Sequence, residues 1–242
     1  MHGREDAYGR LIADALDGKA PIEIVERDDG MVLAYDGRYL VEPFRRWQPV
    51  ERRAMRFVRG RVLDLGCGAG RVCLHLQERG LDVVGIDTSP AAVEACRRRG
   101  VRDAHVLSID EVDARLGRFD TLLMLGNNFG LLGGERAARR VLRRLHAVTN
   151  PGGRLIGQSF DPHGFTDSIE LAYARRNVER GRHFGQQRVR VRYRDLATRW
   201  FDVTLFSPEE MSALLDGTGW RLRRTLPGRG RGYVAVLDRV ES

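Results

Sequence analysis

The chain has 242 residues and a formal net charge of +8, and Lys19 is the only lysine among its 41 basic residues. This length suits one domain with elaborations, or a domain with a small companion, and it is ample to bury a core. No run of about 18 apolar residues is present, and the first six residues lack the apolar core of a signal peptide.

Three cysteines, Cys67, Cys73 and Cys96, match neither a disulfide framework nor a metal-ligand spacing. We therefore expect a cytoplasmic protein that holds no metal and does not span a membrane.

Residues 1–57 predict an amino-terminal lid. Apolar residues at helical spacing predict a helix over residues 1–20, which Gly18 and Pro21 end. Two short strand-like runs at 22–25 and 31–35 flank a turn at 28–30, and a helix over 49–58 begins at Pro49. This segment is long enough to cover a site that later residues build.

Strand and helix patterns alternate between residues 58 and 160. The apolar runs predict strands at 62–65, 83–86, 104–107, 121–125 and 154–160. Helical patterns lie between them, and a turn at Asn150-Pro151-Gly152-Gly153 precedes the last strand. Five βα-type units in succession predict a parallel, doubly wound sheet.

Residues 161–206 interrupt this alternation. A loop beginning at Asp161 leads to a helical stretch at 168–180, and residues 199–206 are a plausible hairpin partner for the strand before them. That strand, 188–194, alternates strictly, so four arginines share one face. The arginine face has two interpretations: contact with an anionic acceptor, or a solvated surface.

Residues 207–242 return to regular structure. Ser207-Pro208 predicts the start of a helix that runs to about Asp216. Strands at 220–226 and 233–238, joined by a glycine-rich turn, predict a terminal antiparallel hairpin.

The stretch with the clearest chemistry is residues 62–71, Val-Leu-Asp-Leu-Gly-Cys-Gly-Ala-Gly-Arg. Glycine allows a sharp turn and close approach to a ligand, and the helix start beyond it presents unpaired N–H groups. The spacing is G-x-G-x-G rather than the G-x-G-x-x-G of dinucleotide sites. Asp87 closes the next strand, where an acid can accept hydrogen bonds from ribose hydroxyls.

The glycine motif at 64–70, together with Gly85-Ile86-Asp87, resembles the class I S-adenosylmethionine-dependent methyltransferases. The resemblance covers about 58–160 and 207–240. It implies a seven-stranded, mostly parallel sheet with an antiparallel last strand. It also implies S-adenosylmethionine as cofactor, S-adenosylhomocysteine as product and an enzyme of class EC 2.1.1. In these terms 58–160 is the cofactor-binding core, 161–206 a β-rich, substrate-side insert before the penultimate helix, and 207–242 the rest of the core.

The resemblance also assigns the cofactor residues. Asp64 and the glycine turn hold the methionine part, Asp87 the ribose, and Thr88 touches the adenosine. The adenine ring is expected near Ser108, Ile109 and Asp110, with Ile109 packing on the ring. Many relatives carry an acid where Ser108 stands, so the polar contact to adenine stays open between Ser108 and Asp110, and Asp110 has an equal claim as a helix cap. The full set is Asp64, Gly66, Cys67, Gly68, Gly70, Asp87, Thr88, Ser108, Ile109, Asp110, Gly126 and Asn127.

The acceptor side is less clearly marked. Asn127 follows the fourth strand and can donate and accept, so it is the candidate for positioning the acceptor or the cofactor's amino group. His163, just past the fifth strand, is the candidate general base, with a solvated loop histidine as the alternative; His183 is the weaker choice. The candidate substrate residues are Tyr8, Tyr35, Asn128 and Phe129.

The resulting hypothesis is transfer of a methyl group to an O, N or C atom of a small molecule, such as a secondary metabolite, by in-line displacement. The basic charge leaves a tRNA or rRNA methyltransferase as an alternative, although arginines scattered over most helices favour a compositional bias. A second alternative is a non-catalytic binding protein of the same fold.

Overall fold

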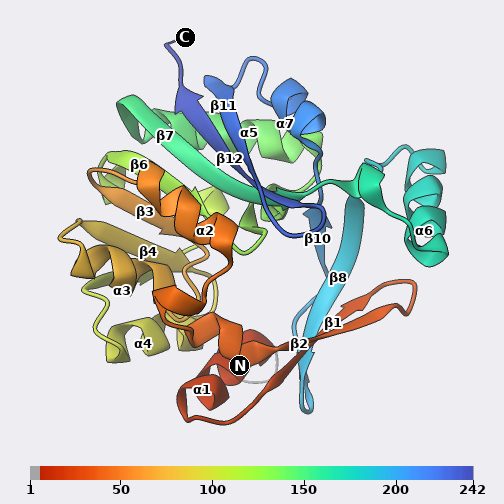
Figure 1. Cartoon of the computed structure of the whole chain (residues 1–242), viewed down its shortest axis with the longest axis horizontal. Coiled ribbons are helices and arrows are strands. Elements are labelled where there is room, and N and C mark those ends of the chain that lie inside the picture. The colour runs from red at the N-terminus through yellow and green to blue at the C-terminus, as the bar shows by residue number, and fades with distance from the viewer. Residues whose placement is uncertain (1–5, 242) are drawn as a thin grey trace. The chain divides into compact units, whose positions relative to one another are not determined.

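The computed structural model describes residues 6–241 (Figure 1). Residues 1–5, which the helix predicted over 1–20 includes, and residue 242 lie outside the described residues. Contacts divide the chain into two compact units. The first comprises the chain up to Trp47, Leu63–Ile109 and Arg188–Phe201; the second comprises Gln48–Val62, Asp110–Gln187 and the chain from Asp202 onward.

Seven strands form one mostly parallel sheet in the order β11-β12-β7-β6-β3-β4-β5. Neighbouring strands run parallel in the pairs β4–β5 and β6–β7, whereas β12 runs antiparallel to both β7 and β11. This confirms the predicted class I fold. The strands are β3 (Val62–Leu65), β4 (Val83–Asp87), β5 (Asp103–Val106), β6 (Phe119–Met124), β7 (Thr149–Phe160), β11 (Trp220–Pro227) and β12 (Gly232–Arg239).

In the first unit, three helices surround the glycine turn: α1 (Ala7–Leu16), α3 (Arg71–Glu78) and α4 (Pro90–Arg98). Ser89 caps α4 by accepting from the amide of Ala92, and Pro90 stands at its first position. The hydroxyl of Ser89 also donates to Asp6, the N-cap residue of α1, at 2.8 Å. The two helix starts are thereby tied together, which sets where α1 lies.

The insert and the amino-terminal strands pair with each other, which the sequence did not predict. Strand β8 (Gln186–Tyr193) runs antiparallel to β1 (Ile22–Arg27), with Val25 opposite Val191. With β2 (Val32–Asp36) and β10 (Phe201–Thr204) they form a sheet of order β10-β8-β1-β2, and β9 (Leu196–Ala197) pairs with β8. An alternating pattern predicts which face a side chain takes but not which strand lies alongside, so this pairing left no local signal.

The arginine face of β8 is occupied by ion pairs within the first unit. Arg190 and Arg192 both contact the carboxylate of Glu26, and Arg194 lies 2.7 Å from Asp14, which is 1% exposed. This face therefore has internal carboxylate partners.

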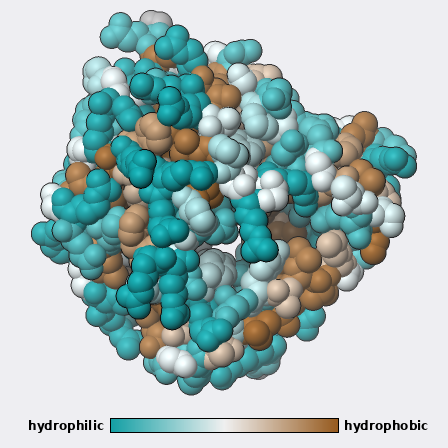
Figure 2. All heavy atoms as spheres, viewed as in Figure 1, coloured by the Kyte–Doolittle hydropathy of each residue, from teal (hydrophilic) through white to brown (hydrophobic). Residues whose placement is uncertain are grey.

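The outer strand β2 carries an exposed apolar surface. Every residue of β2 is exposed, and Val32 is 54% exposed. Figure 2 shows the matching hydrophobic patch over β1 and β2, at the lower right. The neighbouring 3-10 helices η1 (Gly37–Val41) and η2 (Phe44–Arg46) complete this part of the unit.

The second unit surrounds β6 and β7 with α2 (Pro49–Ala54), α5 (Glu135–Ala147), α6 (Ser168–Glu179) and α7 (Pro208–Leu214). Ser207 and Glu210 form a capping box that begins α7. Strand β7 begins at Thr149, five residues earlier than predicted: Phe119 pairs with Thr149 and Thr121 with Arg154. The predicted turn at 150–153 is thus a wide bulge inside the strand. Short 3-10 helices complete the chain: η3 (Met55–Phe57), η4 (Ile109–Glu111), η5 (Ala114–Leu116), η6 (Asn128–Leu132) and η7 (Pro162–Gly164).

Across residues 6–241, none of the helices has the length and apolar character needed to cross a bilayer.

Candidate functional site

The glycine turn after β3 has the left-handed backbone that its residues predict. Gly66, Gly68 and Gly70 have φ angles of 79°, 54° and 73°, which side chains other than glycine adopt at a cost. The amides of Gly66 and Cys67 both donate to the carbonyl of Ile86 at 2.9 Å, so β4 holds the turn in place.

Two glycines of the turn face different surroundings. A Cβ added at Gly70 would lie 2.6 Å from Val101 and 2.7 Å from the thiol of Cys96. A Cβ added at Gly68 would find no heavy atom nearer than 3.9 Å, where Ile12 and the hydroxyl of Tyr8 stand. Gly70 is therefore needed for packing, whereas a Cβ at Gly68 would make only ordinary van der Waals contacts with α1.

Asp87, at the end of β4, accepts hydrogen bonds at both carboxylate oxygens. Its Oδ2 accepts from the amide of Gly68, and its Oδ1 accepts from the amide of Ser89, each at 2.9 Å. Burial raises the pKa of Asp87, and the two amides oppose this shift. Each oxygen keeps a further lone pair, so the carboxylate can still accept from a ribose hydroxyl.

Asp64 lies beneath the turn and is 3% exposed. The thiol of Cys73 donates to its Oδ2 at 3.3 Å. Burial raises the pKa of Asp64 to about 6, while Cys73 and the guanidinium of Arg71 act in the opposite direction. At neutral pH the buried Asp64 is largely ionised, and this lowers the free energy of unfolding.

The adenine-side residues are less enclosed. Thr88 is exposed, and Ser108 and Ile109 are half-buried. Asp110 is exposed on η4, where its carboxylate lies 3.8 Å from Arg140 and its carbonyl accepts from Arg144. The roles of these residues stay predictions.

In the second unit, Asn127 follows β6 in a strained conformation. Its φ angle is 66°, and it is one of two non-glycine residues with positive φ among residues 6–241. Its side-chain Oδ1 is buried and has no hydrogen-bond partner among the described residues. The preceding amide, Gly126, donates to Gln158 on β7 at 2.8 Å and fixes the loop. Strain and an orphaned carbonyl oxygen together are typical of a ligand-binding position.

His163 follows β7 and contacts Glu210 and Phe184, which the sequence did not connect with it. Its Nε2 lies 2.8 Å from Oε1 of Glu210, and Nε2 of His183 lies 3.4 Å from the same oxygen. His163 also stacks on the ring of Phe184, at 4.9 Å between centroids. Glu210 was predicted only as part of a helix start, so its contact with His163 had no sequence signal.

The tautomers of the two histidines follow from their partners. Nδ1 of His183 accepts from the amide of Gly185 at 3.0 Å, so its proton resides on Nε2. Burial lowers the pKa of His183, which keeps the ring neutral. His163 donates from Nε2 to the carboxylate, and its Nδ1 has no partner among residues 6–241. A half-exposed imidazole oriented by a carboxylate is the arrangement of a proton acceptor.

The candidate substrate residues lie in different surroundings. Phe129 is fully buried, meets Phe206 edge-on at 5.9 Å and lies against Gly157, so we assign it to the core. Asn128 is half-buried at the start of η6. Tyr35 is 46% exposed on β2, and Tyr8 is half-buried above Gly68.

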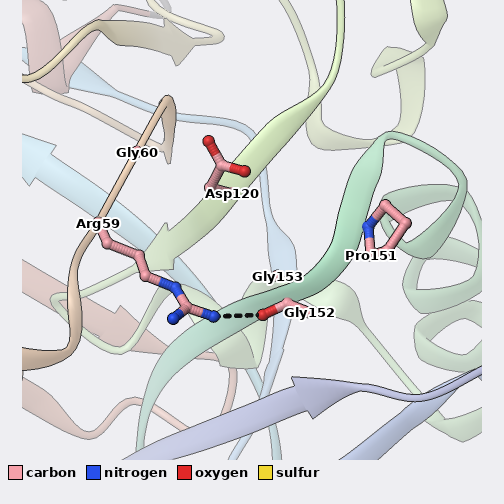
Figure 3. A pocket seen from close by; sticks show the side chains of 6 residues that line it. All are labelled: Arg59, Gly60, Asp120, Pro151, Gly152 and Gly153. Carbon is pink, nitrogen blue, oxygen red and sulfur yellow. Dashed lines mark hydrogen bonds between the residues drawn. The ribbon is translucent and has the colours of Figure 1, made fainter.

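A pocket of about 220 Å³ lies where β6 and β7 begin, and it involves none of the predicted site residues (Figure 3). Arg59 reaches across it to the carbonyl of Gly152 at 2.6 Å, and Asp120 lines its wall. Ligands of open α/β sheets bind at the carboxyl ends of strands, so this pocket lies at the wrong end of β6 and β7.

Together, the seven-stranded sheet and the glycine turn with Asp87 have the architecture of the class I S-adenosylmethionine-dependent methyltransferases. A family model described as a methyltransferase domain matches residues 62–153. A SAM-dependent methyltransferase from Bacteroides fragilis, solved with S-adenosylhomocysteine, superposes with a TM-score of 0.85. It shares 26% identity, and the match covers 100% of this chain and 98% of that one.

Two characterised relatives match part of the chain. Glycine/sarcosine N-methyltransferase of Halorhodospira halochloris is 32% identical over 129 residues, 49% of this chain and 48% of that protein. Ubiquinone biosynthesis O-methyltransferase of Bradyrhizobium diazoefficiens is 29% identical over 124 residues, 49% of this chain and 47% of that protein. The matches thus span about half the length of these relatives.

The cofactor predicted from the motif, S-adenosylmethionine, is confirmed as that of the family. The residues present fit it on two counts. No heavy atom lies nearer than 3.9 Å to the Cβ position of Gly68, so the backbone there is uncrowded, and both oxygens of Asp87 keep capacity for a hydroxyl donor.

Proposed function

We propose that the chain transfers the methyl group of S-adenosylmethionine to a small-molecule acceptor. The observation that carries the proposal is the intact cofactor cradle: a left-handed glycine turn that is uncrowded at Gly68 and held by both oxygens of Asp87. The names of the matched relatives support a small acceptor, because one refers to glycine and sarcosine and another to ubiquinone biosynthesis.

The cofactor, when bound, supplies a methyl group already activated on a sulfonium, so the chain must chiefly position and deprotonate the acceptor. In this proposal Asn127 orients the acceptor, because its orphaned Oδ1 can accept from an N–H or O–H group. His163 accepts the acceptor's proton at Nδ1, and Glu210 stabilises the imidazolium that results.

An RNA acceptor is the second candidate, and the net charge of +8 favours it. Three of the four arginines that suggested a phosphate surface are bound to Glu26 or Asp14, which weakens that argument. Phosphate contacts release counterions, so an RNA-binding enzyme would lose affinity steeply between low and physiological salt.

The test begins with calorimetry of S-adenosylhomocysteine on the parent and on Asp87→Ala. We expect binding by the parent and a loss of at least about 100-fold in the variant, because a buried carboxylate that accepts charge-assisted hydrogen bonds is removed. Absence of binding by the parent would overturn the proposal.

Methyl-labelled cofactor is then offered with separate pools of small amines, small hydroxyl compounds and bulk tRNA. Label in a small-molecule pool supports the proposal, and label in tRNA alone selects the RNA alternative. An Asp113→Ala variant is the matched control, since Asp113 lies apart from the glycine turn and is paired with Arg115 at the surface.

A further inference from the structure

Among its described residues, the first unit contains a buried carboxylate with no cationic partner. Glu23, on β1, is 5% exposed, and within residues 6–241 no arginine, lysine or histidine lies within ion-pair distance of it. Its Oε2 accepts from the hydroxyl of Tyr39 at 2.9 Å. A buried carboxylate without a cation is costly, so its retention calls for a ligand that supplies the missing charge.

A row of side chains leads from Glu23 to the glycine turn. Tyr39, which donates to Glu23, is near enough to Tyr8 that each hydroxyl affects the pKa of the other. The hydroxyl of Tyr8 in turn stands 3.9 Å from the position of a Cβ on Gly68. Tyr8 therefore stands between the buried carboxylate and the turn.

Both tyrosines keep their protons. Burial, followed by the carboxylates of Glu23 and Asp87, raises the pKa of Tyr8, and burial likewise raises the pKa of Tyr39. Two neutral hydroxyls thus stand between Glu23 and the turn, and the charge of Glu23 acts on Tyr8 in a low-dielectric setting.

Charges of both signs lie near this row. Glu23 and Asp87 act on Tyr8 from β1 and β4, and the guanidinium of Arg71 opposes them. A second guanidinium, that of Arg99, donates to the carbonyl of Ala69 in the turn at 2.6 Å. Two carboxylates and one guanidinium thus act on Tyr8, so the position beside it suits a cation better than a neutral ligand.

We propose that Glu23, acting through Tyr39 and Tyr8, is the counter-charge for the sulfonium and makes the cradle prefer S-adenosylmethionine to S-adenosylhomocysteine. The inference rests on the proposed function. Methyl transfer converts a sulfonium into a neutral thioether, so a negative cradle retains the donor and releases the product. Glu23 is then a specificity-determining residue for the charge state of the cofactor.

The experiment compares the two ligands by calorimetry at pH 8 in the parent and in Glu23→Gln. The amide is isosteric and can still accept from Tyr39, so the fold is retained, and thermal unfolding checks this. We expect affinity for S-adenosylmethionine to fall about tenfold while affinity for S-adenosylhomocysteine stays within about twofold. Tyr39→Phe should also lower the ratio of the affinity for S-adenosylmethionine to that for S-adenosylhomocysteine, by a smaller factor.

Glu26→Gln is the matched control, because Glu26 lies on the same strand but is already paired with Arg190 and Arg192; its ratio should equal that of the parent. An unchanged ratio in Glu23→Gln, or an equal loss for both ligands, overturns the inference. If the parent binds neither ligand, it is the proposed function that fails.

Discussion

The glycine turn of the first unit and the loops after β6 and β7 in the second differ in how fully their polar side-chain atoms are hydrogen-bonded. In the turn, both oxygens of Asp87 already accept backbone amides. After β6 and β7, the Oδ1 of Asn127 has no partner among the described residues, and His163 is half-exposed. Cofactor binding thus depends on a backbone that a short motif specifies, whereas acceptor chemistry depends on side chains with unused hydrogen-bonding capacity.

The largest expected effect is a loss of transfer rate without a loss of cofactor affinity. His163→Gln should lower the rate of methyl transfer to a hydroxyl or ammonium acceptor about 10²–10⁴-fold, because the proton acceptor is lost. Affinity for S-adenosylhomocysteine should stay within about twofold, since the cradle is untouched. His105→Gln, which removes an exposed histidine paired with Asp103, should keep the full rate. A full rate in His163→Gln would remove the histidine from the mechanism.

Within the turn, two glycines should respond differently to alanine. Gly70→Ala combines positive φ with contacts of 2.6–2.7 Å to Val101 and Cys96, so we expect a loss of about 3 kcal/mol in the free energy of unfolding. Gly68→Ala has the φ cost alone, about 1 kcal/mol, but places a methyl group in the cradle and should weaken cofactor binding. Gly18→Ala isolates the φ term, because nothing lies within 4 Å of its added Cβ. Denaturant unfolding of the three variants measures the difference, and equal losses would contradict it.

The buried acid beneath the turn predicts a stability that depends on pH. An unfolded Asp has a pKa of about 3.9, and that of Asp64 in the fold is raised by burial to about 6. The folded protein therefore loses stability as pH rises from about 4 to 6, by about 2–3 kcal/mol in total. Asp64→Asn should be more stable than the parent at pH 7 and equal to it near pH 4. A difference that does not change with pH would show that burial does not perturb this carboxyl.

The smallest effect concerns the strained residue of the second region. Asn127→Gly relieves a φ of 66° and should raise the free energy of unfolding by up to about 1 kcal/mol while lowering the rate of transfer. Asn127→Ala keeps the strain and loses the amide, so it should lose rate without gaining stability. If Asn127→Ala also gains stability, relief of backbone strain does not explain the gain in Asn127→Gly.

The sequence was most informative where a local pattern determines the structure. Strand–helix alternation predicted a parallel, doubly wound sheet and the G-x-G-x-G spacing predicted the turn at Gly66–Gly70, because both depend on short-range sterics and periodicity. The count of seven strands came from the family resemblance. It was silent where long-range contact decides. The proposed roles of Glu210 and Glu23 depend on hydrogen bonds to His163 and Tyr39, which are not their neighbours in the chain.

Two differences show the same limit. Phe129 follows a strand as substrate residues do, yet the ring of Phe206 covers it. The Asn-Pro-Gly-Gly stretch at 150–153 consists of residues that favour turns, but β6 pairs with β7 on both sides of it, so the stretch forms a bulge. Turn propensity and position in the chain predict local geometry, and burial is decided by the partner element.

The pairing of β1 with β8 constrains the order in which the chain can fold. Glu26 and Arg190, which bind each other across these strands, are 164 residues apart. At synthesis rates of roughly 5–20 residues per second, β1 waits about 10–30 s for its partner to leave the ribosome. Until then the apolar strand β2 and its neighbour form at most a two-stranded hairpin, which is marginal in water. The amino-terminal strands β1 and β2 are thus among the last parts of the chain to become stable.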